Sequence, residues 1–163
     1  MTDDATPSTA PAWHVLGTGS MAANHARLFQ ADPRVDVVAA ADVDATRAKA
    51  FAAKHDIATS FGNLDDLLAW GKFDAVTNVT PDAVHHPTTM KIIAAGKHVL
   101  CEKPLGICVT DAAENVSGCR EAGVVLMEAF MWRHHPRVAL AKQMIAEGKL
   151  GELRLVKMDF SFV

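Results

Sequence analysis

The stretch WHVLGTGSMA, residues 13–22, decides the fold of this chain. Its first five residues form a short, largely apolar run that predicts a buried strand. A G-x-G-x-x-A pattern, made by Gly17, Gly19 and Ala22, comes directly after, and a helical pattern follows from Ser20 to Gln30. A glycine turn that joins a strand to a helix is typical of the first βα turn in dinucleotide-binding α/β folds.

Each residue of this turn has a physical use if a dinucleotide binds there. Gly17 permits the tight turn, Gly19 lets the backbone approach a pyrophosphate, and Ala22 is small enough for the helix to pack on the strand. The backbone N–H groups of Ser20 and Met21 would face the phosphates. The alternative is a glycine turn without a ligand, which the pattern in isolation leaves equally open.

Asp42 extends the argument, because it ends the second predicted strand 25 residues after Gly17. A carboxylate at that place can accept hydrogen bonds from the hydroxyls of the adenosine ribose. Its position in register with the strand and helix favours the ligand-binding interpretation of the turn. A carboxylate also repels a 2′-phosphate, and Val43 rather than an arginine follows it. With no cation expected beside Asp42, the sequence favours NAD over NADP as cofactor.

Short apolar runs alternate with helical patterns along most of the chain, which predicts repeated βαβ units. We therefore expect an α/β fold with a Rossmann-type doubly wound parallel sheet. The expected strands are residues 13–17, 35–42, 58–61, 74–79, 98–101 and 124–130, and the expected helices are 20–30, 44–55 capped by Asp44, 64–70, 87–95, 110–122 capped by Thr110, and 136–148.

The last ten residues, RLVKMDFSFV, follow a different pattern. Apolar side chains alternate strictly with polar ones, which predicts a strand with one wet face, as in an antiparallel sheet. We expect it to be the first strand of a second domain that is otherwise missing, although an ordinary extra edge strand is the alternative. An uncovered apolar strand is adhesive, so we expect self-association through its apolar residues, Val156, Met158, Phe160 and Phe162.

Length and composition place the chain among ordinary globular proteins. It has 163 residues, 50% of them hydrophobic, and a formal net charge of −3. No basic cluster points to nucleic acid, and no apolar stretch approaches the roughly 18 residues of a membrane span. We expect a disordered tail over residues 1–12, a dinucleotide-binding domain over 13–135, and a linking helix and first strand of a truncated domain over 136–163.

The cysteines and the amino terminus indicate the compartment. Three cysteines without CxxC spacing predict free thiols and a reducing environment. The first twelve residues are small and acidic, unlike a signal peptide. We therefore expect a cytoplasmic protein.

Three polar motifs follow strand ends and should share one edge of the sheet, where ligands of such folds bind. They are NVTPDAVHH (78–86), CEKP (101–104) and EAFMWRHHP (128–136). Lys103 precedes a proline, which keeps its backbone extended and holds the side chain at the mouth of the strand. Its ammonium could pair with Glu102, contact a ribose or donate to a substrate oxygen. The alternative is an ordinary solvated lysine.

The histidines and Trp132 in these motifs have simpler alternatives. His85 and His86 point about 100° apart on a helix, so at most one should reach the crevice. A metal site among the histidines is disfavoured, since no carboxylate or cysteine accompanies them at ligand spacing. Trp132 could lie under a nicotinamide, but from the sequence alone we expect it in the core.

Six stretches together resemble the amino-terminal half of the Gfo/Idh/MocA oxidoreductases, the glucose–fructose oxidoreductase and inositol dehydrogenase family. They are LGTGSMA, AADVDATRAKAFAAKHDI, TPDAVHHP, AAGKHVLCEKPLG, EAGVVLMEAFMWRHHP and AKQMIAEGKLGELRLVKMDFSF. GKHVLCEKP is the most specific of them, and MEAFMWRHHP looks like the branch of dihydrodiol and sugar dehydrogenases. The resemblance implies hydride transfer between a nicotinamide cofactor and a hydroxyl-bearing carbon of a sugar, polyol or cyclic diol.

The resemblance also implies roles for individual residues. Lys103 matches the lysine of the family's EKP motif, which contacts the cofactor ribose and acts on the substrate hydroxyl as acid or base. Glu102, Arg133 and Thr80 match cofactor-side positions, with Trp132 beside them, and His85 matches a histidine near the active site. These matches favour a functional Lys103 over a solvated one.

Two departures from the family limit what the resemblance implies. Asp82 stands where the dihydrodiol branch often carries histidine, which leaves the substrate class open. The family also has a second domain, built on an antiparallel sheet, that supplies substrate contacts and an Asp, His or Tyr partner for the lysine, and we expect only its first strand here. A non-catalytic NAD-binding module, or an inactive fragment that associates through its last strand, is the alternative to an enzyme.

Overall fold

The computed structural model describes residues 10–159 and 161, and its internal contacts divide the chain into two compact units. The first unit is Met1–Ala129 and the second is Phe130–Val163. The expected tail falls mostly on residues 1–9, which lie outside the described residues. The expected boundary after residue 135 falls inside the second unit.

A six-stranded sheet with the order β3-β2-β1-β4-β5-β6 forms the centre of the first unit. Every neighbouring pair of strands runs parallel, which confirms the Rossmann-type doubly wound fold. The strands are β1 (Ala12–Leu16), β2 (Asp36–Ala41), β3 (Thr59–Phe61), β4 (Ala75–Asn78), β5 (His98–Cys101) and β6 (Leu126–Glu128). The order reverses between β1 and β4, and the crevice beyond the carboxyl ends of two such strands is where these folds bind ligands.

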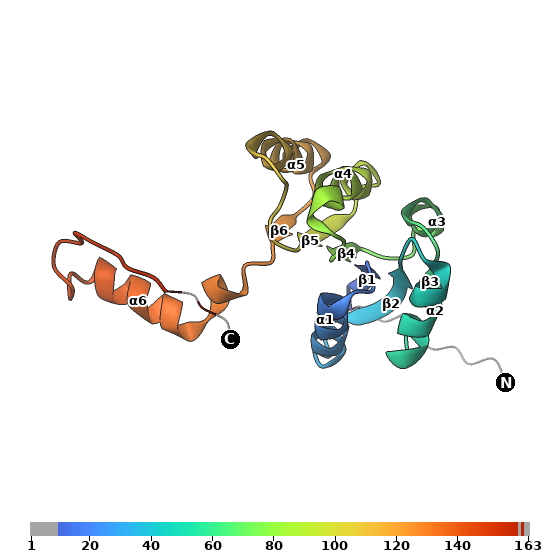
Figure 1. Ribbon diagram of the computed structural model, residues 1–163, viewed down its shortest axis with the longest axis horizontal. Coiled ribbons are helices and arrows are strands. Elements are labelled where there is room, and N and C mark those ends of the chain that lie inside the picture. The colour runs from blue at the N-terminus through green and yellow to red at the C-terminus, as the bar shows by residue number, and fades with distance from the viewer. Residues whose placement is uncertain (1–9, 160, 162–163) are drawn as a thin grey trace. The chain divides into compact units, whose positions relative to one another are not determined.

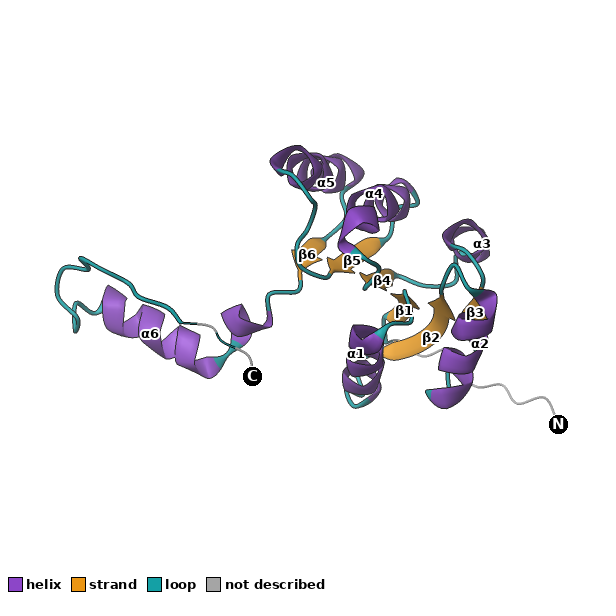
Figure 2. Cartoon of the chain, in the orientation of Figure 1, coloured by secondary structure: helices purple, strands orange, loops and turns teal. Residues whose placement is uncertain are grey.

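Helices cover both faces of this sheet, with α1 and α2 on one side and α3, α4 and α5 on the other (Figure 1). In the first unit they are α1 (Ser20–Gln30), α2 (Ala45–Lys54), α3 (Leu64–Trp70), α4 (His85–Ala94) and α5 (Val109–Ala122), and a short 3-10 turn, η1 (Asp82–Val84), precedes α4. The alternation of helix and strand is visible in Figure 2. None of the helices among the described residues is long and apolar enough to cross a membrane.

The two faces of the sheet have separate apolar cores because side chains alternate along each strand. Val15 and Ala40 pack with residues of α1 and α2, including Ala22 and Phe51. The opposite core contains residues of β1, β2, β4, β5 and the other three helices, among them Leu16, Ala39, Ala41, Leu67, Val76, Ile92, Val99 and Cys119.

Helix ends follow the expected capping chemistry with one correction. The Asp44 side chain accepts hydrogen bonds from the backbone at the start of α2, as expected. Helix α5 is capped by Cys108 rather than Thr110: the Cys108 sulfur accepts from the backbone N–H of Asp111, whose carboxylate accepts from the N–H of Ile107. These reciprocal bonds start the helix two residues early, as in a capping box.

Strand β6 is shorter and less buried than the expected strand over 124–130. It spans Leu126–Glu128, and the Met127 side chain is 41% exposed. It is the outermost strand, and within the described part of the chain it pairs with β5 alone, so one edge of its backbone has no strand partner there.

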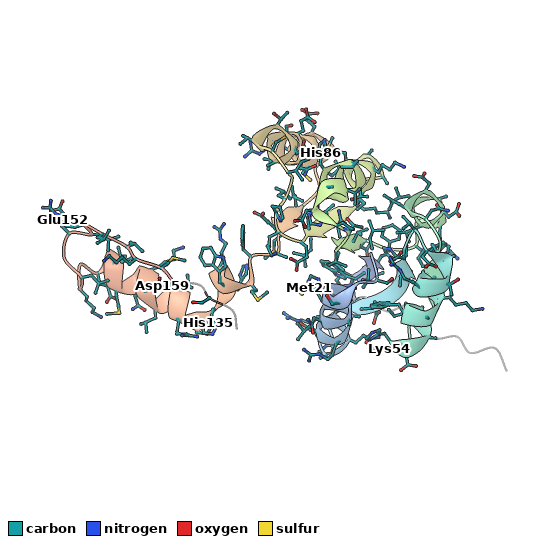
Figure 3. The ribbon with its side chains drawn as sticks, viewed as in Figure 1. Met21, Lys54, His86, His135, Glu152 and Asp159 are labelled. Carbon is teal, nitrogen blue, oxygen red and sulfur yellow. The ribbon has the colours of Figure 1, made fainter. Side chains whose placement is uncertain are left out.

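The second unit contains the 3-10 turn η2 (Met131–His134) and helix α6 (Pro136–Ala146). No residue of α6 is buried. Residues 151–159 contain no strand, so the expected alternating strand is not formed over them; Glu152 and Asp159 mark this segment in Figure 3. A strand requires backbone hydrogen bonds to a neighbour, and the described chain offers this segment none. Phe160 and Phe162 lie outside the described residues.

Candidate dinucleotide site

The glycine turn between β1 and α1 has the backbone geometry that close approach of a ligand requires. Gly17 has a φ of +89°, and a Cβ there would lie 2.8 Å from the carbonyl oxygen of Val79, so no larger residue fits without strain. A Cβ on Gly19 would meet nothing within 4 Å, so the space above it is open. Helix α1 has no side-chain cap, and its first N–H groups lack partners within the helix.

This turn forms one wall of a pocket of about 370 Å³. The lining residues come from the turn, from the ends of β2 and β4 and from the first turn of α2: Gly17, Thr18, Gly19, Ser20, Met21, Asp42, Arg47, Val79, Thr80 and Pro81. Met21 is labelled at the start of α1 in Figure 3. Open space above a glycine, faced by the N–H groups of a helix start, fits a pyrophosphate. The predicted residues Gly17, Gly19, Ser20, Met21, Asp42 and Thr80 therefore line one pocket.

Asp42 is buried at the end of β2, where it holds the glycine turn in place. One carboxylate oxygen accepts from the backbone N–H of Thr18 at 3.0 Å and from its hydroxyl at 2.6 Å. The other accepts from the N–H of Asp44 at 3.0 Å and from the Arg47 guanidinium at 2.7 Å. Burial would raise the pKa of Asp42, but these hydrogen bonds outweigh burial and lower the pKa overall. The pocket therefore contains a fixed negative charge at neutral pH.

Arg47 corrects the premise on which NAD was preferred. The sequence argument placed no cation beside Asp42, yet the Arg47 guanidinium is ion-paired with it and lines the same pocket. Asp44 caps α2, and the first turn of that helix brings Arg47 back toward the end of β2. The guanidinium is 63% exposed, so it can also reach a ligand.

Glu102 and Lys103 lie at the carboxyl end of β5 and differ in their surroundings. Glu102 is 7% exposed, and its second carboxylate oxygen accepts from the backbone N–H of Lys103 at 3.1 Å. Lys103 is exposed, and the following peptide bond to Pro104 is cis. Its ammonium makes no hydrogen bond or ion pair with the described residues, including Glu102.

His25 is a member of this cluster that the sequence argument missed. It projects from α1, with Nδ1 2.7 Å from the Thr77 hydroxyl and Nε2 3.1 Å from a Glu102 carboxylate oxygen. The helical period that buries Ala22 and Ala26 also turns His25 toward the sheet. This helical spacing is the feature of the sequence that could have identified His25 as facing the sheet.

His85 is buried at the start of α4, with 1% of its surface exposed. Its Nδ1 lies 2.7 Å from the carbonyl oxygen of Pro104 and its Nε2 lies 2.7 Å from that of Thr80. Both ring nitrogens are therefore engaged by backbone. The ring connects a wall of the dinucleotide pocket with the turn that follows Lys103.

The remaining predicted residues belong elsewhere. Trp132 and Arg133 lie in η2 of the second unit, and Trp132 is 55% exposed, so the expectation of a core tryptophan is wrong. The second unit offers one helix and no buried residue around it. His86 contacts Asn115 and Glu114, and the described residues contain no group of three or more His, Cys, Asp or Glu side chains that could hold a metal.

Comparison with known proteins agrees with this geometry. Residues 12–130 match the model of the GFO_IDH_MocA family, an oxidoreductase family with an NAD-binding Rossmann fold. The chain belongs to the Gfo/Idh/MocA oxidoreductase family. The trans-1,2-dihydrobenzene-1,2-diol dehydrogenase of Macaca fascicularis is 35% identical over 150 residues, which are 91% of this chain and 45% of that enzyme. The chain thus spans less than half the length of this relative.

Solved structures of the family have the same fold in their corresponding part. The WlbA dehydrogenase of Bordetella pertussis, in complex with NADH and UDP-GlcNAcA, superposes with a TM-score of 0.83 at 29% identity, over 87% of this chain and 41% of that one. A Y186F mutant of the 3-ketoreductase KijD10 from Actinomadura kijaniata, in complex with TDP-benzene and NADP, gives 0.81 at 33% identity, over 89% and 45%. Members of the family therefore include complexes with either nicotinamide dinucleotide.

Proposed function

We propose that this chain is the nucleotide-binding half of an NAD(P)-dependent dehydrogenase that transfers hydride between nicotinamide and a hydroxyl-bearing carbon of a sugar, polyol or cyclic diol. The observation that carries the proposal is the pocket over Gly19, which opens at the same edge of the sheet as the end of β5, where Lys103 lies. The diol dehydrogenase and the nucleotide-sugar complex among the relatives support this substrate class.

The residues of the pocket would hold the dinucleotide by its phosphates and its adenosine ribose. The N–H groups of Ser20 and Met21 would bind the pyrophosphate, and Asp42 would accept from the ribose hydroxyls. To do so it must share an oxygen that already accepts from Thr18 or Arg47. Asp42 repels a 2′-phosphate and neutralises Arg47, and for this reason we propose NAD as the preferred cofactor.

Lys103 would act as the acid and base at the substrate hydroxyl. The bound nicotinamide would take up or release the hydride, while the lysine would hold or remove the hydroxyl proton at its Nζ. Its ammonium makes no bond to a described residue, so the proton it carries is available to a substrate. Thr80, at the pocket wall, would contact the cofactor from the β4 side.

Calorimetry with this chain tests cofactor binding. We expect NAD to bind more tightly than NADP, and Asp42→Asn to weaken NAD binding by about 10-fold or more, since hydrogen bonds to a charged group contribute about 1.5–3 kcal/mol. Asp65→Asn, which changes an exposed carboxylate paired with Lys91, is the control and should leave affinity unchanged. Tighter binding of NADP than of NAD, or an unchanged NAD affinity in Asp42→Asn, would contradict the proposed role of Asp42.

Turnover tests the chemistry. Nicotinamide absorbance is followed with sugars, polyols and cyclic diols as substrates. The unmodified chain is compared with Lys103→Met, and Lys72→Met is the control. If NAD binds and no substrate is turned over, the enzyme proposal fails for this chain. That result would fit either a non-catalytic NAD-binding module or an inactive fragment.

We further propose self-association through the carboxyl-terminal segment, and a cytoplasmic setting. Val156 and Met158 are 65% and 86% exposed, and exposed apolar segments of this kind favour association. The three thiols are unpaired, which suits a reducing compartment. Light scattering should give a smaller mass for Val156→Ser with Met158→Ser than for the unmodified chain; an unchanged mass would refute association through these residues.

A further inference from the structure

Lys103 has buried histidine contacts on both of its chain neighbours. His25, from α1, reaches the carboxylate of Glu102, the residue before it. His85, from α4, reaches the carbonyl of Pro104, the residue after it. The two histidines come from helices on opposite faces of the sheet, and each also contacts the β4 side, through Thr77 and Thr80 respectively.

We propose that His25 and His85 are positioning residues that fix Lys103 by holding Glu102 and Pro104. That this positioning serves catalysis rests on the proposed function of Lys103. That the two histidines hold the backbone around Lys103 rests on their contacts with Glu102 and Pro104.

The contacts of His25 form a complete chain of donors and acceptors. A carboxylate can only accept, so His25 Nε2 must carry the hydrogen that points at Glu102. Nδ1 can then accept from the Thr77 hydroxyl, 2.7 Å away. The second Glu102 oxygen accepts from the Lys103 backbone N–H. Three hydrogen bonds thus connect β4, through α1, with the lysine itself.

The contacts of His85 are different because both partners are backbone carbonyl oxygens. A carbonyl oxygen has no hydrogen to donate, and each lies 2.7 Å from a ring nitrogen. A ring N–H can donate to either oxygen, so the buried ring lies between the Thr80 and Pro104 backbones and sets their separation.

The titratable groups around His85 leave its bonds undisturbed. Those near it in the chain or the fold are Asp82, His86, Glu102, Lys103 and Glu128. His86 contacts Asn115 and Glu114, Glu102 contacts His25, and Glu128 accepts from the N–H of Leu105. Among the described residues, none of these side chains bonds to the His85 ring.

Positioning matters here because no hydrogen bond or ion pair with a described residue holds the Lys103 side chain. The ammonium is exposed and makes no bond to a described residue, so its location depends on the backbone on either side of its Cα. Glu102 and His85 are almost fully buried, which makes them rigid anchors. Loss of either anchor should release the turn without unfolding the sheet.

Nitrogen-15 relaxation NMR of the backbone of the full chain tests the proposal. The backbone order parameters of Lys103 and Leu105 should fall from about 0.85 toward 0.6 in His25→Phe and in His85→Phe. His25→Gln retains a donor for Glu102 and should restore part of the order at Lys103.

His98→Gln is the matched control, because His98 lies at the opposite end of β5 and its Nδ1 accepts from the Val125 N–H. That variant should leave the order at Lys103 unchanged. Order at the unmodified level in both phenylalanine variants would overturn the proposal. These measurements involve neither cofactor nor turnover, so their failure is distinct from failure of the proposed function.

Discussion

Lowering the pH from 7 to 5 should destabilise the first unit through His14. This histidine lies in β1, at the centre of the sheet; it is fully buried, and neither ring nitrogen has a hydrogen-bond partner among the described residues. Burial lowers its pKa to about 3. The backbone of Ala39 opposes this shift without reaching hydrogen-bond geometry. The folded protein therefore keeps the ring neutral where an unfolded chain would protonate it.

The sign and size follow from proton linkage. The folded pKa lies below the unfolded value of about 6.5, so the unfolded chain binds a proton between pH 6.5 and 3 that the folded chain excludes. Stability that is present above the unfolded pKa is lost as the pH falls, by up to about 1.4 kcal/mol per pH unit. Between pH 7 and pH 5 the loss from His14 alone is about 2 kcal/mol.

Urea unfolding followed by circular dichroism, at pH 7 and pH 5, isolates this contribution through His14→Leu. Leucine does not titrate, so His14→Leu should escape this loss. Between pH 7 and pH 5, its free energy of unfolding should rise by about 2 kcal/mol relative to that of the unmodified chain. His134→Gln, at an exposed histidine of the second unit, is the control and should show no such gain. If the difference between His14→Leu and the unmodified chain does not change with pH, the ring is not kept neutral and the reasoning fails.

Two further predictions concern the glycine turn and the thiols. Gly17→Ala should lower the free energy of unfolding by about 1–3 kcal/mol, because Gly17 has a positive φ and a Cβ there would clash with Val79. Gly19→Ala should change the free energy of unfolding by less than about 0.5 kcal/mol. The same variant should weaken NAD binding in calorimetry. Equal losses of stability would contradict the geometry of the turn. Burial raises the pKa of Cys101 to about 12 and also raises that of Cys119. A thiol reagent at pH 8 should therefore modify only the exposed Cys108 until urea is added. Modification of Cys101 before urea is added would show that its thiol is accessible in the folded protein.

The sequence predicts the parts of this fold that depend on local pattern. Helices 20–30 and 64–70 were predicted with the bounds they have. The glycine turn fixes the start of the first, and an asparagine start and a glycine end bound the second. The order of strands and their parallel pairing follow from the alternation of elements.

Contacts between distant residues were not readable in the same way. The ion pair of Arg47 with Asp42 depends on how α2 leaves its cap, and the bonds of His25 to Thr77 and Glu102 join residues 52 and 77 positions apart. Lys103 was correctly placed at the mouth of β5, but the way its neighbours are held required the structure. The strand expected over residues 154–163 is not formed in its described part, because pairing depends on a partner as much as on the strand's own pattern.

The sheet order separates two kinds of evolutionary change. Asp42 follows β2, on one side of the β1–β4 seam, and Lys103 follows β5, on the other. Substitutions that change the preference for NAD or NADP therefore fall on different strands and loops from substitutions around Lys103. A lineage, or a protein engineer, can therefore change one preference while the other stays under its own selection, although His25 and the close approach of Gly17 to Val79 connect the two sides.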